Sequence, residues 1–236
     1  MPFDTLEEGI DTVIKIRQVS TDIAAIEFME REAIALAESY LDIPFPIQSG
    51  TAYLLLTFDG DELSDIKKNY EKVKPICYEN GAIDFRVLDN ETLFNNVWQI
   101  RGALVTAIEA YSEQEPIDVV VPINVSAEFI KYTKEIARTY DVQIQSFGHA
   151  GDGNVHLCIV RGTLSDEAWH EKLDKVLKDI YKKANELEGL PSGEHGIGLT
   201  KKPYFLQYTS PESIQLMKRV KKAFDEKNIL NPYKIF

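Results

Sequence analysis

A glycine-rich run at residues 148–156, Gly-His-Ala-Gly-Asp-Gly-Asn-Val-His, is the feature that most constrains how this chain can fold. Asp152-Gly153 is a preferred sequence for a two-residue type I′ turn, so the run predicts an antiparallel β-hairpin. If these two residues form the turn, strict pairing places His149 directly opposite His156. The fold must then contain an antiparallel pair of strands whose two histidines share one face.

Segments typical of strands and helices alternate along the rest of the chain. Strands are expected at 23–28, 52–58, 82–88, 118–122, 142–148 and 154–160, and helices at 5–20, 30–40, 61–79, 90–111, 126–140, 165–188 and 211–228. The order from 118 to 188 is the β-α-β-β-α order of a ferredoxin-like unit, and residues 53–88 indicate a second such half. Few of the strands are apolar throughout. The sequence therefore predicts an α+β fold, with one mostly antiparallel sheet and helices packed on one side.

Composition limits the class of protein and its partners. The 236 residues are 44% hydrophobic and 27% charged, as in a globular domain, and the net charge of −12 argues against nucleic acid or an anionic membrane surface as a partner. No apolar run reaches 18 residues, so no membrane span is expected. Cys77 and Cys158 are far apart in sequence, and the acidic N-terminus lacks a leader pattern. These features predict a cytoplasmic protein with free thiols.

The paired histidines indicate a metal site. Two imidazoles on one face of a hairpin suit a divalent ion, and Asn154, two residues before His156, points to the same face. A second glycine-bracketed loop, Ser192-Gly-Glu-His-Gly196, supplies Glu194 as the natural third ligand. His195 can approach the same volume without binding the ion. Two histidines and one carboxylate leave open coordination positions, as catalytic zinc sites do.

Spacing alone leaves the chemistry of such a site open. Zinc or manganese could activate water for hydrolysis, or iron could support oxygenase chemistry. Alternatively, the metal could hold a substrate hydroxyl and carboxylate while a nearby base takes the proton. A free-standing metal-dependent hydrolase is thus one alternative. A non-enzymatic ferredoxin-like binding module is another, in which the histidines are incidental and lie apart. We interpret Asp152 as a turn residue and His170 as a solvated residue.

Several motifs occur together and in a fixed order. They lie at 25–31, 91–101, 147–157, 193–198 and 229–236, and they include Gly-His-Ala-Gly-Asp-Gly-Asn-Val-His, Gly-Glu-His-Gly-Ile-Gly and Leu-Asn-Pro-Tyr-Lys-Ile-Phe. In this order they resemble the C-terminal, substrate-binding domain of FAD-linked oxidases. The most similar branch is that of the D-lactate and D-2-hydroxyglutarate dehydrogenases and the glycolate oxidase D subunit. The resemblance covers residues 1–236 as one domain.

The resemblance implies a role for each candidate residue. His195 would be the base that removes the proton from the C2 hydroxyl of a small 2-hydroxy acid, while the C2 hydride passes to FAD. Arg101 would bind the substrate carboxylate, which suits a guanidinium, and Asn154 would contact the substrate or hold a ligand. The divalent metal, with zinc as the expected ion, would be bound by His149, His156 and Glu194.

Two departures from the family pattern shape the expectations about partners and substrate. The family binds FAD mainly through an N-terminal domain, which is absent from this chain, and no glycine-rich phosphate loop precedes the motifs. We therefore expect either a fragment of a full flavoenzyme or a cap that pairs with a flavin subunit in trans. Alone it should be inactive, with an apolar docking face that favours self-association as a homodimer. Tyr233 also stands where the family has a glycine, so the particular hydroxy acid is left open.

Overall fold

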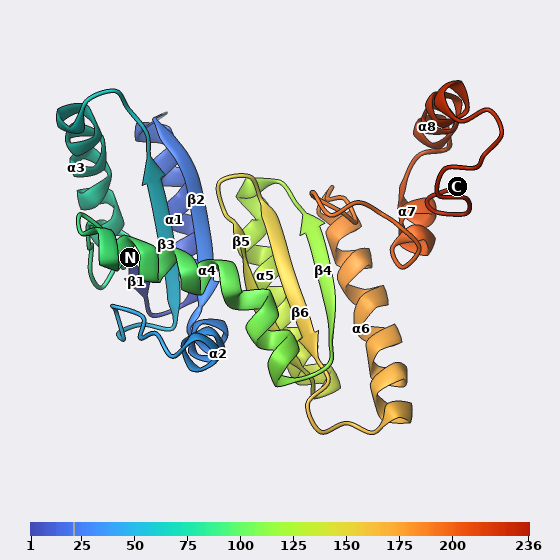
Figure 1. The fold of residues 1–236 in the computed structure, drawn as a ribbon, viewed down its shortest axis with the longest axis horizontal. Helices are drawn as coiled ribbons and strands as arrows, with labels where there is room; N and C mark the ends of the chain where they lie inside the picture. Colours follow the sequence, from blue (N-terminus) through green and yellow to red (C-terminus); the bar gives the residue numbers. More distant parts are fainter. Residues whose placement is uncertain (21) are drawn as a thin grey trace.

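The computed structural model describes residues 1–20 and 22–236, and these contain one six-stranded sheet (Figure 1). Its strands lie in the order β1-β3-β2-β5-β6-β4, and every neighbouring pair is antiparallel. The strands are β1 (Pro2–Phe3), β2 (Ile23–Glu30), β3 (Ala52–Phe58), β4 (Gln114–Val120), β5 (Gln143–His149) and β6 (Asn154–Val160). The expected α+β class and the single antiparallel sheet are confirmed.

Several helices begin at residues whose side chains cap them. Thr5 forms a capping box with Glu8, and the side chains of Asn90 and Ser165 accept hydrogen bonds from the first turns that follow them. The helices are α1 (Leu6–Val19), α2 (Arg31–Leu41), α3 (Leu63–Glu79), α4 (Glu91–Tyr111), the 3-10 turn η1 (Ile123–Val125), α5 (Ser126–Tyr140), α6 (Asp166–Glu186), α7 (Lys202–Tyr208) and α8 (Pro211–Phe224). The short helix α7 was not expected. Among the described helices, none combines the length and apolarity needed to cross a membrane.

The sheet consists of two halves of the same design. The C-terminal half follows the expected order β4-α5-β5-β6-α6, with the spatial strand order β5-β6-β4. The N-terminal half repeats it as β1-α1-β2-β3-α3, with α2 inserted between β2 and β3 and the spatial order β1-β3-β2. The expected strand at 82–88 is wrong. The outer edge of β3 at Ala52 and Tyr53 is already paired by β1, so the chain after α3 makes only an isolated bond from Ile83 N–H to the Pro2 carbonyl.

Helices cover both faces of the sheet, so the expectation that they pack on one side is wrong. Successive residues of a strand point to opposite faces, and both faces of the central strands are apolar. Phe28 and Leu157 belong to the core beneath α1, α3, α5 and α6, whereas Met29 and Cys158 belong to a second core beneath α2 and α4. Figure 1 shows α4 crossing one face of the sheet, with α1 and α5 behind it.

The hairpin of β5 and β6 has a different register from the one predicted. His149 pairs with Asn154, and His156 pairs with Phe147. The register differs from the prediction by two residues, and side chains alternate between faces with a period of two. Both histidines and Asn154 therefore still share one face, which is the face covered by α2 and α4.

The connection between β5 and β6 is longer than a type I′ turn because its backbone forms hydrogen bonds to the segments on both sides. Gly151 N–H donates to the carbonyl of Ile26 in β2, and the Gly153 carbonyl accepts from Val121 N–H beyond β4. A type I′ turn needs positive φ at both central residues, whereas only Gly153, at φ 72°, has it here and Asp152 does not. These bonds to both sides extend the connection to the four residues 150–153.

Candidate metal centre

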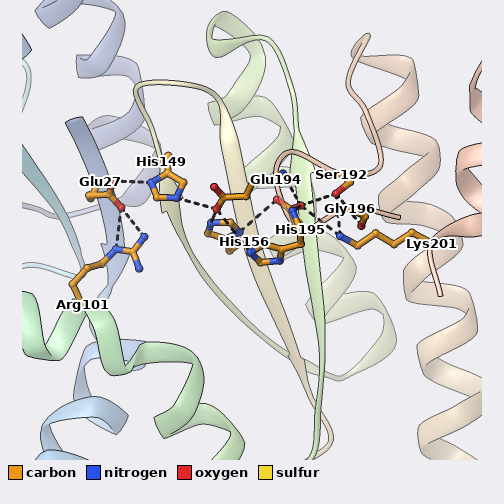
Figure 2. A network of polar contacts seen from close by, with 10 residues as sticks. Glu27, Arg101, His149, His156, Ser192, Glu194, His195, Gly196 and Lys201 are labelled. Carbon is orange, nitrogen blue, oxygen red and sulfur yellow. Dashed lines mark hydrogen bonds and ion pairs between the residues drawn. The ribbon is translucent and has the colours of Figure 1, made fainter. Parts of the chain in front are cut away.

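Three side chains from separate elements come together on the face of the sheet that α2 and α4 cover (Figure 2). His149 lies at the end of β5, His156 lies within β6, and Glu194 comes from the loop between α6 and α7. Glu194 Oε1 is 3.2 Å from Nε2 of His149 and 3.2 Å from Nε2 of His156. One ligand atom from each residue lies within 4.8 Å of the others. Zinc bonds of ~2.0–2.1 Å in a tetrahedron separate ligand atoms by roughly 3.3 Å, so the three residues fit a divalent metal.

The protonation state of His156 suits metal binding. Its ring is buried in the sheet, and this burial lowers the pKa of His156 to about 4, although nearby Asp118 acts in the opposite direction. The imidazole is therefore neutral near pH 7, with a nitrogen lone pair free to bind an ion. The ring of His149 meets it edge to face, with the centroids 5.2 Å apart.

A buried carboxylate lies behind His149. Glu27, directly opposite His149 across the β2–β5 pair, accepts the Nδ1 hydrogen bond at 2.7 Å. This bond fixes the tautomer that leaves Nε2 facing Glu194, as carboxylates commonly do behind metal-binding histidines. Our sequence reasoning missed Glu27. The available signal was an acidic residue in the otherwise apolar stretch of β2.

Arg101 is held by that same carboxylate. Its Nε and Nη2 donate to Glu27 Oε2 at 3.0 and 2.6 Å, and its guanidinium lies 5.7 Å from the centroid of the Phe147 ring. The Glu27 side chain is 7% exposed and that of Arg101 is 14% exposed. The structure thus connects Arg101 to the metal centre through Glu27 and His149. Its expected contact with a substrate carboxylate stays a prediction.

Breaking this pair should cost stability. Arg101→Met leaves the buried Glu27 with His149 as its remaining partner, so we expect the free energy of unfolding to fall by about 3 kcal/mol. The double variant Glu27→Gln/Arg101→Met removes both charges and should recover part of this loss. Urea denaturation of the 236-residue chain measures both effects. As a control, Lys175→Met breaks an exposed pair with Glu171 and should leave the free energy of unfolding almost unchanged. Equal losses of unfolding free energy in Arg101→Met and Lys175→Met would contradict the expectation.

A second buried carboxylate, Asp118 of β4, holds the loop that carries Glu194. Its Oδ2 accepts hydrogen bonds from Ser192 Oγ at 2.8 Å, from Glu194 N–H at 3.0 Å and from His195 N–H at 2.8 Å. Burial by itself would raise the pKa of Asp118. The three hydrogen bonds and the nearby Lys201 ammonium outweigh that effect and hold the pKa well below its usual range. Asp118 is therefore ionised. It too was missed from the sequence.

His195 and Asn154 complete the cluster. The His195 ring stacks on that of His156 with the centroids 4.9 Å apart and the planes at 4°, and about half of its side chain is exposed. A cleft of about 800 Å³, bounded by α8 and the C-terminal tail, opens beside it. Asn154 is buried beneath the loop, where a Cβ on Gly193 would lie 2.6 Å from its Nδ2. Position 193 therefore needs glycine for this close approach.

The structure brings the predicted residues together from distant parts of the sequence. The binding-module alternative requires the histidines of the two motifs to lie apart, whereas in the structure they lie together. Arg101 is joined to the cluster through Glu27. His170 lies exposed on α6, with its Nδ1 bonded to the Asp166 carbonyl, as expected for a solvated residue.

Comparison with known proteins identifies relatives over the whole chain. The chain is 38% identical over 241 residues to a D-lactate dehydrogenase from Anaerostipes hadrus, covering 100% of this chain and 51% of that protein. Over 239 residues it is 33% identical to glycolate oxidase subunit GlcD of Bacillus subtilis, covering 99% and 49%. It is 29% identical to a D-2-hydroxyglutarate dehydrogenase of Stutzerimonas stutzeri over 233 residues, covering 97% and 50%. The chain thus spans about half the length of these relatives.

Solved structures and family membership agree with this finding. A 4-ethylphenol oxidase from Gulosibacter chungangensis shares the fold with a TM-score of 0.66 at 14% sequence identity, over 99% of this chain and 52% of that one. Residues 1–235 match the family described as FAD linked oxidases, C-terminal domain. The chain therefore belongs to the FAD-linked oxidase family, and it corresponds to the C-terminal domain of that family.

Proposed function

We propose that this chain is the substrate- and metal-binding part of an FAD-dependent 2-hydroxy acid dehydrogenase of the D-lactate, glycolate or D-2-hydroxyglutarate type. The full enzyme would oxidise a 2-hydroxy acid to a 2-oxo acid. The observation that carries the proposal is the three-ligand cluster of His149, His156 and Glu194 with the half-exposed His195 beside it. The names of the relatives, which act on these acids, support the substrate class.

The residues of the cluster have complementary tasks in this reaction. His149, His156 and Glu194 would hold a divalent metal, for which we propose zinc, and that ion would stabilise negative charge developing on the C2 oxygen. His195 takes the proton from the C2 hydroxyl, because the ring nitrogen of a neutral imidazole can accept a proton. Its main-chain bond to Asp118 fixes the loop, so the base stays beside the metal ligands. Asn154, whose Oδ1 has no hydrogen-bond partner among the described residues, would contact the substrate or a ligand.

FAD would come with a domain that corresponds to the half of the relatives that this chain does not match, in cis or in trans. When bound, the flavin supplies the acceptor for the C2 hydride, which no side chain can replace. An apolar surface supports docking of such a domain. The helix α8 has no buried residue, and exposed apolar side chains gather there and in the tail: Leu216, Met217, Val220, Phe224, Ile229, Leu230 and Tyr233. Self-association through this surface as a homodimer, and a cytoplasmic location, also stay proposals.

Reconstitution tests the proposed activity. The chain is produced together with an FAD-binding half, and D-lactate, glycolate and D-2-hydroxyglutarate are added without oxygen. We expect at least one acid to bleach the flavin absorbance and to yield its 2-oxo acid. A complex that holds FAD yet stays oxidised with the whole panel would overturn the proposal. Turnover of ester or phosphate substrates without flavin would instead favour the hydrolase alternative.

A further inference from the structure

We infer that Asp118 is a positioning residue that holds two of the three metal ligands, Glu194 and His156, in place for the ion. The inference rests on the proposed function, because it concerns the same metal centre. Asp118 is not one of the three proposed ligands, although it, His156 and His195 also offer ligand atoms within 4.8 Å of one another. In the proposed site its carboxylate acts through the groups that it binds.

The first contact is with the loop that carries Glu194. That loop begins at a bridge between Leu190 and Val120, which exchange two main-chain hydrogen bonds. Beyond this bridge, Glu194 N–H and His195 N–H both donate to Asp118 Oδ2. The Glu194 side chain is itself half exposed. In the described residues, the Asp118 carboxylate therefore ties the backbone of this ligand to the sheet.

The second contact is with His156. Asp118 and His156 are direct partners across the β4–β6 pair, and Asp118 Oδ1 lies 3.7 Å from His156 Nδ1. Both atoms are buried, and neither has a hydrogen-bond partner among the described residues. Buried polar atoms rarely stay unpaired, and a small side-chain shift that closes this 3.7 Å gap would satisfy both atoms with one hydrogen bond. Such a bond would leave the other ring nitrogen, Nε2, for the ion.

His149, the other histidine ligand, has the same arrangement, and there the hydrogen bond to the carboxylate is formed. Glu27 is the direct cross-strand partner of His149 and binds its Nδ1 at 2.7 Å. Each of the two ligand histidines therefore has a buried carboxylate directly opposite it on the neighbouring strand. This repetition supports a role for Asp118 in the metal centre, beyond holding a loop.

Zinc affinity of the 236-residue chain tests the inference, measured by competition with a chelating dye. Asp118→Asn should weaken zinc binding about 10- to 100-fold, the usual effect of removing a carboxylate that orients a ligand. This variant also leaves the buried Lys201 ammonium without its carboxylate, which by itself threatens folding. The double variant Asp118→Asn/Lys201→Met removes both charges and separates the two effects. Its zinc affinity should stay as low as that of the single variant while its resistance to urea recovers.

Two controls complete the design. Lys201→Met alone removes the contacts of Lys201 to Asp118 and Ser192 Oγ but keeps the three hydrogen bonds of Asp118 to the loop, so its zinc affinity should fall far less than that of Asp118→Asn. Glu30→Gln removes a carboxylate of β2 that likewise pairs with a lysine, Lys134, and accepts a backbone N–H, from Ser146, away from the metal centre. It should lose stability but no zinc affinity.

Wild-type affinity in both Asp118 variants, together with loss of zinc from His149→Ala/His156→Ala, would overturn the role of Asp118 and leave the proposed function intact. Failure of the wild-type chain to bind zinc or any other divalent metal would overturn both. Equal weakening in Glu30→Gln and Asp118→Asn would also count against Asp118, because it would trace the effect to general destabilisation.

Discussion

The double variant His149→Ala/His156→Ala is expected to lose zinc binding completely. The wild-type chain should hold about one zinc per molecule, because both Nε2 atoms and Glu194 Oε1 face one another within 4.8 Å. Removing both imidazoles leaves the half-exposed Glu194 carboxylate, and a single carboxylate does not retain zinc through dialysis. Elemental analysis after dialysis into chelator-free buffer measures the zinc content. Added zinc should also raise the melting temperature of the wild type but not of the variant, since an ion that binds the folded state stabilises it.

The matched control for this experiment is His170→Ala. His170 is a histidine of the same chain, exposed on α6 and remote from the metal centre, so its loss should leave the zinc content unchanged. Equal zinc in the double variant and the wild type would show that the ion binds elsewhere. The metal centre proposed from these ligands would then be wrong.

The fold was predictable where local signals agree with one another. The apolar run at 52–58 and the helical patterns at 90–111 and 126–140 are clear in the sequence, and the structure contains a strand and two helices there within a residue of the expected bounds. The strand predicted at 82–88 does not form, because β1 already pairs with the edge of β3 that residues 82–88 would have joined. The local sequence does not show this competition between segments. A two-residue strand such as β1 has too few residues to show a period. The position of helices on both faces depends on alternating residues such as Phe28 and Met29 that are both apolar.

The site was predictable as far as its motifs extend. The hairpin register was wrong by two residues, yet the shared face of His149 and His156 survived because side-chain direction repeats every two residues. Glu27 and Asp118 were missed because they come from β2 and β4, far from the histidines in sequence, and no local pattern reveals which strands become neighbours. The structure identifies each as a buried acid directly opposite a histidine across a strand pair.

Arg101 also shows what the sequence leaves undetermined about the site. A family pattern can place an arginine near a site, but it does not show which carboxylate the side chain binds. In this structure its nitrogens bind Glu27, a partner 74 residues away in sequence. Two halves of the sheet meet at β2 and β5, and this junction brings Glu27 beside His149. The metal centre therefore depends on how the halves are joined as much as on the motif itself.

The variant His195→Asn is expected to lose nearly all turnover while keeping its metal. In the reconstituted enzyme, flavin reduction by the preferred hydroxy acid should slow by about 10²- to 10⁴-fold, the usual contribution of a positioned general base. The reason for retained metal is geometric: His195 donates its main-chain N–H to Asp118, and this bond does not depend on the side chain. Rapid mixing under anaerobic conditions measures the rate of flavin bleaching, and elemental analysis measures the zinc.

Two comparisons make this last expectation decisive. His170→Asn carries the same replacement at an exposed helix position and should reduce the flavin at the wild-type rate. The stacked contact with His156 offers a different explanation for the importance of His195, since losing the ring could disturb a ligand rather than remove a base. In that case zinc affinity would fall together with the rate. A slow variant with full zinc content identifies His195 as the base, whereas a fast variant contradicts that role.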